Sequence, residues 1–203
     1  MAVNYSDDFL GSTLDPKWTY GVLLGTGSYS VSGSSLHLNA DAGGSGVGVS
    51  ILIDLPCNVF LRFSETGTPN IGAQSLLAVY KTNIMADGQG VLSINNALGT
   101  AIKLPGSIGA TKNLSAEPFS FNLIIEADGV IVVRVKNASN NWEVCPAVHS
   151  PISFLGESDC YLTIGCINTS GSVYSNDIDW INNSDARPAP PVTDEKQQIF
   201  VLI

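Results

Sequence analysis

The feature that most constrains this chain is an alternation of apolar and polar residues with a period of two. It is clearest in "FSFNLIIEA", residues 119–127, where every second side chain from Phe119 to Ile125 is apolar. Asp128-Gly129 follows, and "VIVVRVK" then alternates again, with Arg134 and Lys136 on the polar side. Successive side chains of a β-strand point to opposite faces, and Asp-Gly favours a two-residue hairpin turn. This stretch predicts an antiparallel β-hairpin.

The same alternation recurs along most of the chain, and no long stretch has helical periodicity. Further strands are predicted over residues 29–40, 46–55, 59–66, 75–82, 91–97, 160–168 and 176–182. Only 13% of the residues are charged, against roughly 25% in typical soluble domains. Ser, Thr, Asn and Gly must therefore supply much of the polar surface. Short strands separated by turn residues predict an all-β sandwich or barrel.

Three stretches carry a resemblance to a known family. "DDFLGSTLDPKWT" resembles the opening of concanavalin A-like, or laminin G-like, jelly-roll domains. The stretch 119–144 is similar to that family's central hairpin, and "LTIGCINTSGSVYSNDIDWIN" resembles its closing pair of strands. The resemblance implies a two-sheet antiparallel jelly-roll sandwich with Trp18 at a core position. We expect a domain over residues 1–183, with an N-terminal arm at 1–6, and a Pro-rich C-terminal tail at 184–203.

Charge and cysteine usage narrow the classes of function. The formal net charge of −9 disfavours nucleic acid and anionic membranes as partners. "MAVNYSDDFLGS" lacks the basic and apolar regions of a secretory signal, which predicts synthesis in a cytoplasm. The cysteines Cys57, Cys145, Cys160 and Cys166 lack metal-site spacing and are predicted to be reduced and core-facing. Cys160 and Cys166 share a strand face but lie about 20 Å apart, too far for a disulfide.

The acidic residues offer one candidate for an enzymatic site. Some families with this fold are glycanases whose catalytic strand resembles E-x-D-x-x-E, because a retaining mechanism needs two carboxylates about 5.5 Å apart. The nearest match is Glu157 with Asp159, but Tyr161-Leu162 stand where the third acid belongs. An ordinary loop is the favoured interpretation. The sequence therefore predicts no enzymatic activity and no cofactor.

The remaining candidates concern metals and sugars. Asp177 and Asp179 share a strand face and are a weak candidate pair for Ca²⁺, although solvated acidic residues are favoured. His37 is predicted to point to solvent, and two isolated histidines predict neither a metal site nor a catalytic triad. Sugar binding needs exposed aromatic rings, for which Trp142 and Tyr174 are candidates. Trp180 is expected to face the interior.

The C-terminal tail suggests an assembly element. A proline-rich stretch leads to five consecutive apolar residues, and such an exposed segment is an aggregation hazard unless it is covered. We expect these residues to add a strand to, or pack in a groove on, a neighbouring chain. They are Ile199, Phe200, Val201, Leu202 and Ile203. Docking of the tail on its own domain remains the alternative.

Together these features predict a non-enzymatic structural or interaction protein. A Ser/Gly/Asn-rich sandwich with an assembling tail resembles the jelly-roll proteins that decorate phage capsids or form tail appendages. The expected location is the virion, and the expected partners are protein chains in a homo- or hetero-oligomer, with an adhesive outer face. The main alternative is a stand-alone, lectin-like glycan-binding module, and a divergent glycanase ranks below both.

Overall fold

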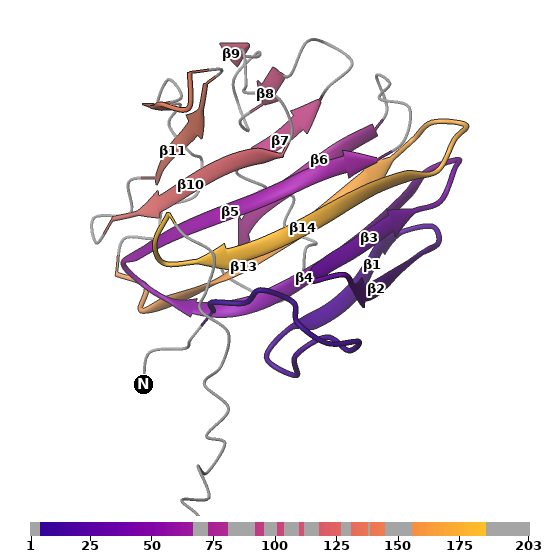
Figure 1. Ribbon diagram of the computed structural model, residues 1–203, viewed down its shortest axis with the longest axis horizontal. Coiled ribbons are helices and arrows are strands. Elements are labelled where there is room, and N and C mark those ends of the chain that lie inside the picture. The colour runs from indigo at the N-terminus through magenta and orange to yellow at the C-terminus, as the bar shows by residue number, and fades with distance from the viewer. Residues whose placement is uncertain are drawn as a thin grey trace, which may run out of the picture.

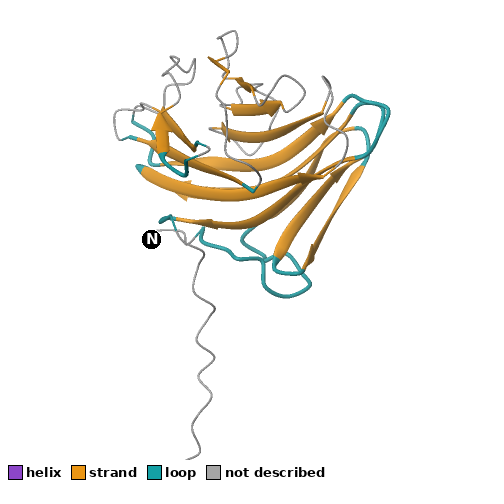
Figure 2. Cartoon of the chain, turned by 45° about the horizontal axis from the view of Figure 1, so that its top comes forward, coloured by secondary structure: helices purple, strands orange, loops and turns teal. Residues whose placement is uncertain are grey.

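The chain folds into β-structure alone over the part that is described. The computed structural model describes residues 5–66, 73–80, 92–95, 101–103, 110–111, 118–126, 131–137, 139–144 and 156–185. Figure 2 shows these residues as strands joined by loops. The described part of the chain contains no helix with the length and hydropathy needed to cross a bilayer.

The strands form two seven-stranded antiparallel sheets, which overlie one another in Figure 1. Sheet A consists, in spatial order, of β12 (Trp142–Val144), β11 (Ile131–Lys136), β10 (Phe119–Ile125), β5 (Cys57–Thr66), β14 (Tyr174–Asn182), β3 (Ser35–Ala40) and β2 (Gly27–Ser32). Sheet B consists of β1 (Thr19–Leu24), β4 (Ser45–Asp54), β13 (Asp159–Asn168), β6 (Ala73–Tyr80), β7 (Leu92–Asn95), β8 (Ala101–Lys103) and β9 (Ala110–Thr111). This arrangement confirms the predicted jelly-roll sandwich.

The alternating strands bury one face each, and these faces form the core. In the predicted hairpin, β10 pairs with β11 so that Phe121 lies opposite Val135, and both are buried. Phe63 of β5 stacks on Phe121 with ring centroids 5.3 Å apart. β13 contributes Leu162 and Ile164 from sheet B. Inward-facing side chains of two sheets interdigitate in such sandwiches, so the period of two seen in the sequence sets the core.

The N-terminal motif has a structural role. The Asp7 carboxylate accepts hydrogen bonds from the Phe9 backbone N–H (2.8 Å) and the Trp18 indole N–H (2.9 Å). Lys17 Nζ lies 3.2 Å from the same carboxylate. The Asp7 backbone exchanges two hydrogen bonds of 2.9 Å with Ile181 of β14. The spacing of acid, Phe and Trp therefore fastens the N-terminal segment to sheet A and places Trp18 in the core, as the resemblance implied.

One predicted strand is in fact a hairpin. Residues 29–40 divide into β2 and β3 at Gly33-Ser34, whose φ angles are 59° and 63°. Two consecutive positive φ values define a type I′ turn, the tightest connection between antiparallel strands. The sequence did not predict this turn, because the Ser residues on both sides of it are also common within exposed strands. The turn folds β2 onto β3 and brings Ser32 near His37.

A bulge in β14 corrects the expectation for Trp180. The register between β14 and β5 shifts between Ile178 and Trp180, so Asp179 is the extra residue. Trp180 then lies opposite Arg62, on the outer face of sheet A, and Ile181 instead joins the core. A β-bulge places two residues against one and reverses the alternation beyond it. Trp180 is buried but does not face the interior of the sandwich.

Several predicted features lie outside the described residues. These are the docking residues Ile199 to Ile203, the turn at Asp128-Gly129, Cys145 and the second histidine, His149. Of the N-terminal arm, only Tyr5 and Ser6 are described. Both contact the domain itself: Tyr5 donates to the Asn58 carbonyl at 2.6 Å, and Ser6 donates to Asn182 Oδ1 at 2.8 Å.

Candidate functional site

The outer face of sheet A carries an array of polar side chains, which we call the polar field. It is formed by the residues of β2, β3 and β14 that point away from the core. Its members are Ser28, Ser30, Ser32, Ser35, His37, Asn39, Ser175, Asp177 and Asp179. Because antiparallel neighbours share a face, the register aligns Ser30, His37 and Asp177 in one row across the three strands.

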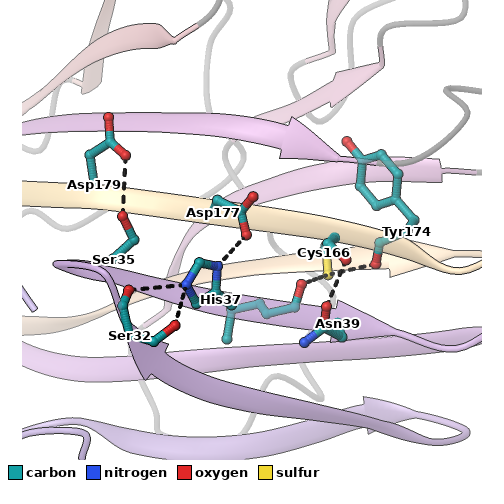
Figure 3. Close-up of polar contacts among 10 residues, drawn as sticks. Ser32, Ser35, His37, Asn39, Cys166, Tyr174, Asp177 and Asp179 are labelled. Carbon is teal, nitrogen blue, oxygen red and sulfur yellow. Dashed lines mark hydrogen bonds and ion pairs between the residues drawn. The ribbon is translucent and has the colours of Figure 1, made fainter. Parts of the chain in front are cut away.

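A Ser, a His and an Asp contact one another within the polar field, as Figure 3 shows. His37 Nδ1 lies 2.7 Å from Asp177 Oδ1. On the other side of the ring, Nε2 lies 3.1 Å from Ser32 Oγ and 3.1 Å from the Ser32 carbonyl oxygen. His37 does point outward, as predicted. It is not isolated, because β14 supplies an acid that is 140 residues away in sequence.

The same contacts weaken the calcium candidate. Asp179 Oδ2 lies 3.3 Å from Arg62 Nε, and its Oδ1 accepts a hydrogen bond from Ser35 at 3.4 Å. Asp177 faces His37 instead. A Ca²⁺ site needs six to eight oxygen ligands converging on one point, whereas these two carboxylates face different nitrogen partners. Among the described residues, no group of three or more His, Cys, Asp or Glu side chains is placed to hold a metal ion.

Next to the polar field, the outer face of sheet A becomes aromatic. We call Phe60, Lys136, Trp142 and Asp185 the aromatic end. The half-buried Trp142 ring meets Phe60 edge-on, with centroids 5.6 Å apart, and Lys136 Nζ lies 5.1 Å from its centre. Asp185 accepts a hydrogen bond from the Trp142 indole N–H at 3.1 Å and pairs with Lys136 at 2.9 Å. The ring is thus held in place while part of it stays in solvent.

The other residues singled out in the sequence are placed elsewhere. Tyr174 is only 1% exposed and its hydroxyl lies 3.2 Å from Ser75 Oγ inside the sandwich. Its ring has no face to offer a sugar, so we withdraw it as a glycan contact. Glu157 is exposed in the loop before β13, and Asp159 is the first residue of that strand. Asp159 lies directly opposite Asp54 of β4.

The described cysteines, Cys57, Cys160 and Cys166, are buried and form no disulfide with one another. Cys160 and Cys166 lie in the core with Leu162 and Ile164, as predicted. Burial raises the pKa of the Cys57 thiol from 9.0 to about 11, and burial also raises the pKa of Cys160. A thiol must ionise to act as a nucleophile, so these groups serve packing. Burial likewise raises the pKa of Tyr5 to about 12.

The outer face of sheet B differs from that of sheet A at its strands β4 and β13. β4 and β13 place Ser50 and Thr163 there, yet these residues are only 7% and 1% exposed. Their hydroxyl groups lie 2.7 Å apart and bond to each other. Gly48 and Gly165 follow on the same face, one opposite the other. The described side chains at the centre of this face are small, shielded from solvent and already paired.

No protein-family model matches the chain, and no curated protein matches it in sequence. Solved structures do resemble it. A β-1,3-glucanase from Mycobacterium marinum matches with a TM-score of 0.56 and 11% identity, over 88% of this chain and 97% of that one. The Emp46p carbohydrate recognition domain matches with a TM-score of 0.58 and 14% identity, over 87% and 94%.

A third structure is a pseudo β-1,3-glucanase of Mycobacterium tuberculosis, with a TM-score of 0.57 and 12% identity over 89% of this chain and 98% of that one. At these identities the likeness establishes the fold. The chain therefore shares the two-sheet jelly-roll fold of the Emp46p carbohydrate recognition domain and of a glycosyl hydrolase family 16 protein from Mycobacterium smegmatis.

This finding overturns the prediction that the chain is not an enzyme, since the fold is that of an enzyme family. The physical reason for the error is that only acids along one strand were considered. Strand pairing can bring carboxylates together from distant parts of the sequence, as it does for Asp54 and Asp159. A search for E-x-D-x-x-E along single strands does not detect such pairs.

Proposed function

We propose that the chain is a carbohydrate-binding protein whose ligand lies against Trp142 at the aromatic end of sheet A. The observation that carries the proposal is the fixed, partly exposed indole ring with Lys136 and Asp185 beside it. Sugar sites combine an aromatic surface with a few polar groups that set the orientation of the ring. The similar structures, a β-1,3-glucanase and a carbohydrate recognition domain, support the same class of ligand.

The contacts around Trp142 favour a preorganised site. Phe60 and Lys136 restrict the ring, and Asp185 fixes its N–H edge, so little rotamer entropy is lost when a ligand binds. The Asp185 carboxylate accepts hydrogen bonds and the Lys136 ammonium donates them, and both complement sugar hydroxyl groups. The two charges balance each other, so the aromatic end can approach an uncharged ligand without leaving a single buried charge.

The proposal is tested by binding of the full chain to a glycan array, followed by titration with a soluble β-1,3-glucan and with mucin O-glycans. Trp142→Ala should weaken binding about thirtyfold, the loss expected when a central aromatic contact worth about 2 kcal/mol is removed. Tyr29→Ala is the matched control, because Tyr29 is an exposed aromatic residue outside the aromatic end. Equal binding by wild type and Trp142→Ala would contradict the proposal.

A second candidate is docking of the chain into a larger assembly, with the virion as its location. It is favoured by one contact: Asp185, near the start of the Pro-rich tail, bonds to Lys136 and Trp142 on the outer face of sheet A. Light scattering on residues 1–203 and 1–186 tests it. Assembly through Ile199 to Ile203 predicts oligomers of the longer chain alone, and identical monomers would count against it.

A further inference from the structure

The polar field contains an arrangement of three side chains that neither the aromatic end nor the fold requires. Ser32 ends β2, His37 lies in the middle of β3, and Asp177 lies on β14, so three neighbouring strands each contribute one group. The Asp–His contact is 2.7 Å and the His–Ser contact is 3.1 Å. Hydroxyl, imidazole and carboxylate follow one another in that order (Figure 3).

The hydrogen bonds determine the tautomer of the imidazole. A carboxylate only accepts, so Nδ1–H of His37 donates to Asp177. In the neutral ring, Nε2 then carries the lone pair and accepts from the Ser32 hydroxyl. Once Nε2 is protonated, the Ser32 carbonyl oxygen at 3.1 Å becomes a hydrogen-bond acceptor for it. Both protonation states of His37 therefore have partners.

We propose that Ser32, His37 and Asp177 form a nucleophilic acyl-transfer site that hydrolyses carboxylic esters on the outer face of sheet A. Such a triad is recognised by geometry and roles, and it occurs on unrelated folds in different chain orders. Ser32 and His37 are the catalytic residues. Asp177 is the positioning residue, because it holds the imidazole in the tautomer that can accept a proton.

The reaction needs no oxidant or cofactor. Ser32 Oγ attacks the ester carbonyl carbon, its proton passes to His37 Nε2, and the bond to the alcohol oxygen breaks as that oxygen takes the proton. Water then attacks the acyl carbonyl carbon while His37 Nε2 accepts one of its protons. The bond from that carbon to Ser32 Oγ breaks, His37 returns the proton to Ser32 Oγ, and the carboxylic acid leaves. The Gly33 amide, from the residue that follows the nucleophile, is the donor we assign to the developing oxyanion.

The accessibility of the three groups points to the substrate. The side chains of His37 and Asp177 are 28% and 26% exposed, and Ser32 is exposed beside the β2–β3 turn. An open site of this kind suits a small acyl group that projects from a larger molecule. If the proposed carbohydrate binding holds, an acyl ester carried by a glycan is the expected substrate, and that refinement alone rests on the proposed function.

The test uses the full chain with p-nitrophenyl acetate, which carries no sugar and so reports on the ester site even if glycan binding fails. Ser32→Ala and His37→Gln should each lower kcat at least a hundredfold, within the range usual for loss of proton transfer. Asp177→Asn should lower kcat with KM unchanged, a split that a purely structural role would not produce. Ser30→Ala is the control, since Ser30 lies opposite His37 on the same face.

Covalent labelling identifies the nucleophile directly. A fluorophosphonate should form a bond from phosphorus to Ser32 Oγ with loss of fluoride, and peptide mass spectrometry should find the added mass on the peptide containing Ser32. His149→Gln controls for unspecific catalysis by a second imidazole. Thermal melting verifies that each variant is folded. Absence of labelling in the wild type, or an ester hydrolysis rate that Ser32→Ala leaves unchanged, would overturn the proposal.

Discussion

The outer faces of the two sheets are built from the same kind of strand, yet they differ in what they present to solvent. At the centre of sheet B, Ser50 and Thr163 point away from the core but are shielded and bonded to each other. On sheet A, outward residues such as His37 and Asp177 stay partly exposed and bond across strands. Among the described residues, the outward polar side chains that are both accessible and bonded to each other across strands therefore lie on sheet A.

This difference shows in the sequence of the strands. β4 is buried at eight of its ten positions and reads as a nearly continuous run of apolar and small residues. β3 alternates between buried and partly exposed positions along its whole length. A strand that is buried on both faces does not alternate between apolar and polar residues, whereas a strand with one solvent-exposed face does. Chemistry that needs water or a ligand is confined to strands of the second kind.

The largest effect is expected where the small residues of sheet B are enlarged. A Cβ at Gly165 would lie 2.4 Å from the Val47 carbonyl oxygen, whereas a Cβ at Gly21 would meet nothing within 4 Å. Gly165→Val should lower the free energy of unfolding by about 3 kcal/mol or more through overpacking. Gly21→Val should change it by less than about 0.5 kcal/mol. Urea denaturation measures both, and equal effects would contradict the tight packing at Gly165.

The shielded hydroxyl pair on sheet B provides the next test. Thr163→Val leaves the Ser50 hydroxyl without its partner and should cost about 1–3 kcal/mol of stability. Adding Ser50→Ala removes the orphaned group, and the double variant should regain part of that loss. If the double variant is as unstable as the sum of the two single variants, the two hydroxyls do not stabilise each other.

Alkaline pH should lower the free energy of unfolding, because it ionises a thiol that is buried in the core between the two sheets. The folded pKa of Cys57, about 11, lies above its ordinary value of 9.0 because burial disfavours the thiolate. The stability contributed by the neutral thiol is complete below pH 9 and is lost as the pH rises toward 11. Linkage predicts a loss of about 1 kcal/mol at pH 10. Cys57→Ala should flatten this pH dependence of urea unfolding, and an unchanged slope would contradict the assignment.

The smallest effect belongs to the exposed ion pair of sheet A. Arg62 and Asp179 are partly exposed and 3.3 Å apart. Exposed pairs contribute about 0–1 kcal/mol, so Arg62→Gln should shift the thermal midpoint only slightly, and less in high salt. A loss comparable to that of Thr163→Val would mean that the polar field is more deeply desolvated than its exposure indicates.

The sequence predicted the parts of the fold that depend on local alternation. The hairpin of β10 and β11 and the inward cysteines of β13 follow from residues close together in the chain, whereas the core position of Trp18 was implied by the family resemblance. Position 180 was misassigned because the bulge at Asp179 depends on pairing with β5, which no local pattern encodes. The short strands β8, β9 and β12 lack enough residues to show a period.

The candidate sites were harder to predict for the same reason. His37 and Asp177 meet only because β3 pairs with β14, and Ser32 joins them only because Gly33-Ser34 turns the chain. Four residues of the type Ser-Gly-Ser-Ser were a signal for that turn, but hydroxyl residues are also common within exposed strands. Trp142 was recognised from its polar neighbours, whereas Lys136 and Asp185 became its partners only in the folded chain.

If sheet A carries the ligand-binding face, hydroxyl-radical footprinting with and without a bound glycan should show protection of Trp142 and Phe60 by the ligand. The exposed residues Val22 and Leu24 of β1, at the edge of sheet B, should react equally with and without it. Protection of Val22 and Leu24 with no change at Trp142 would place the ligand on sheet B and contradict the account.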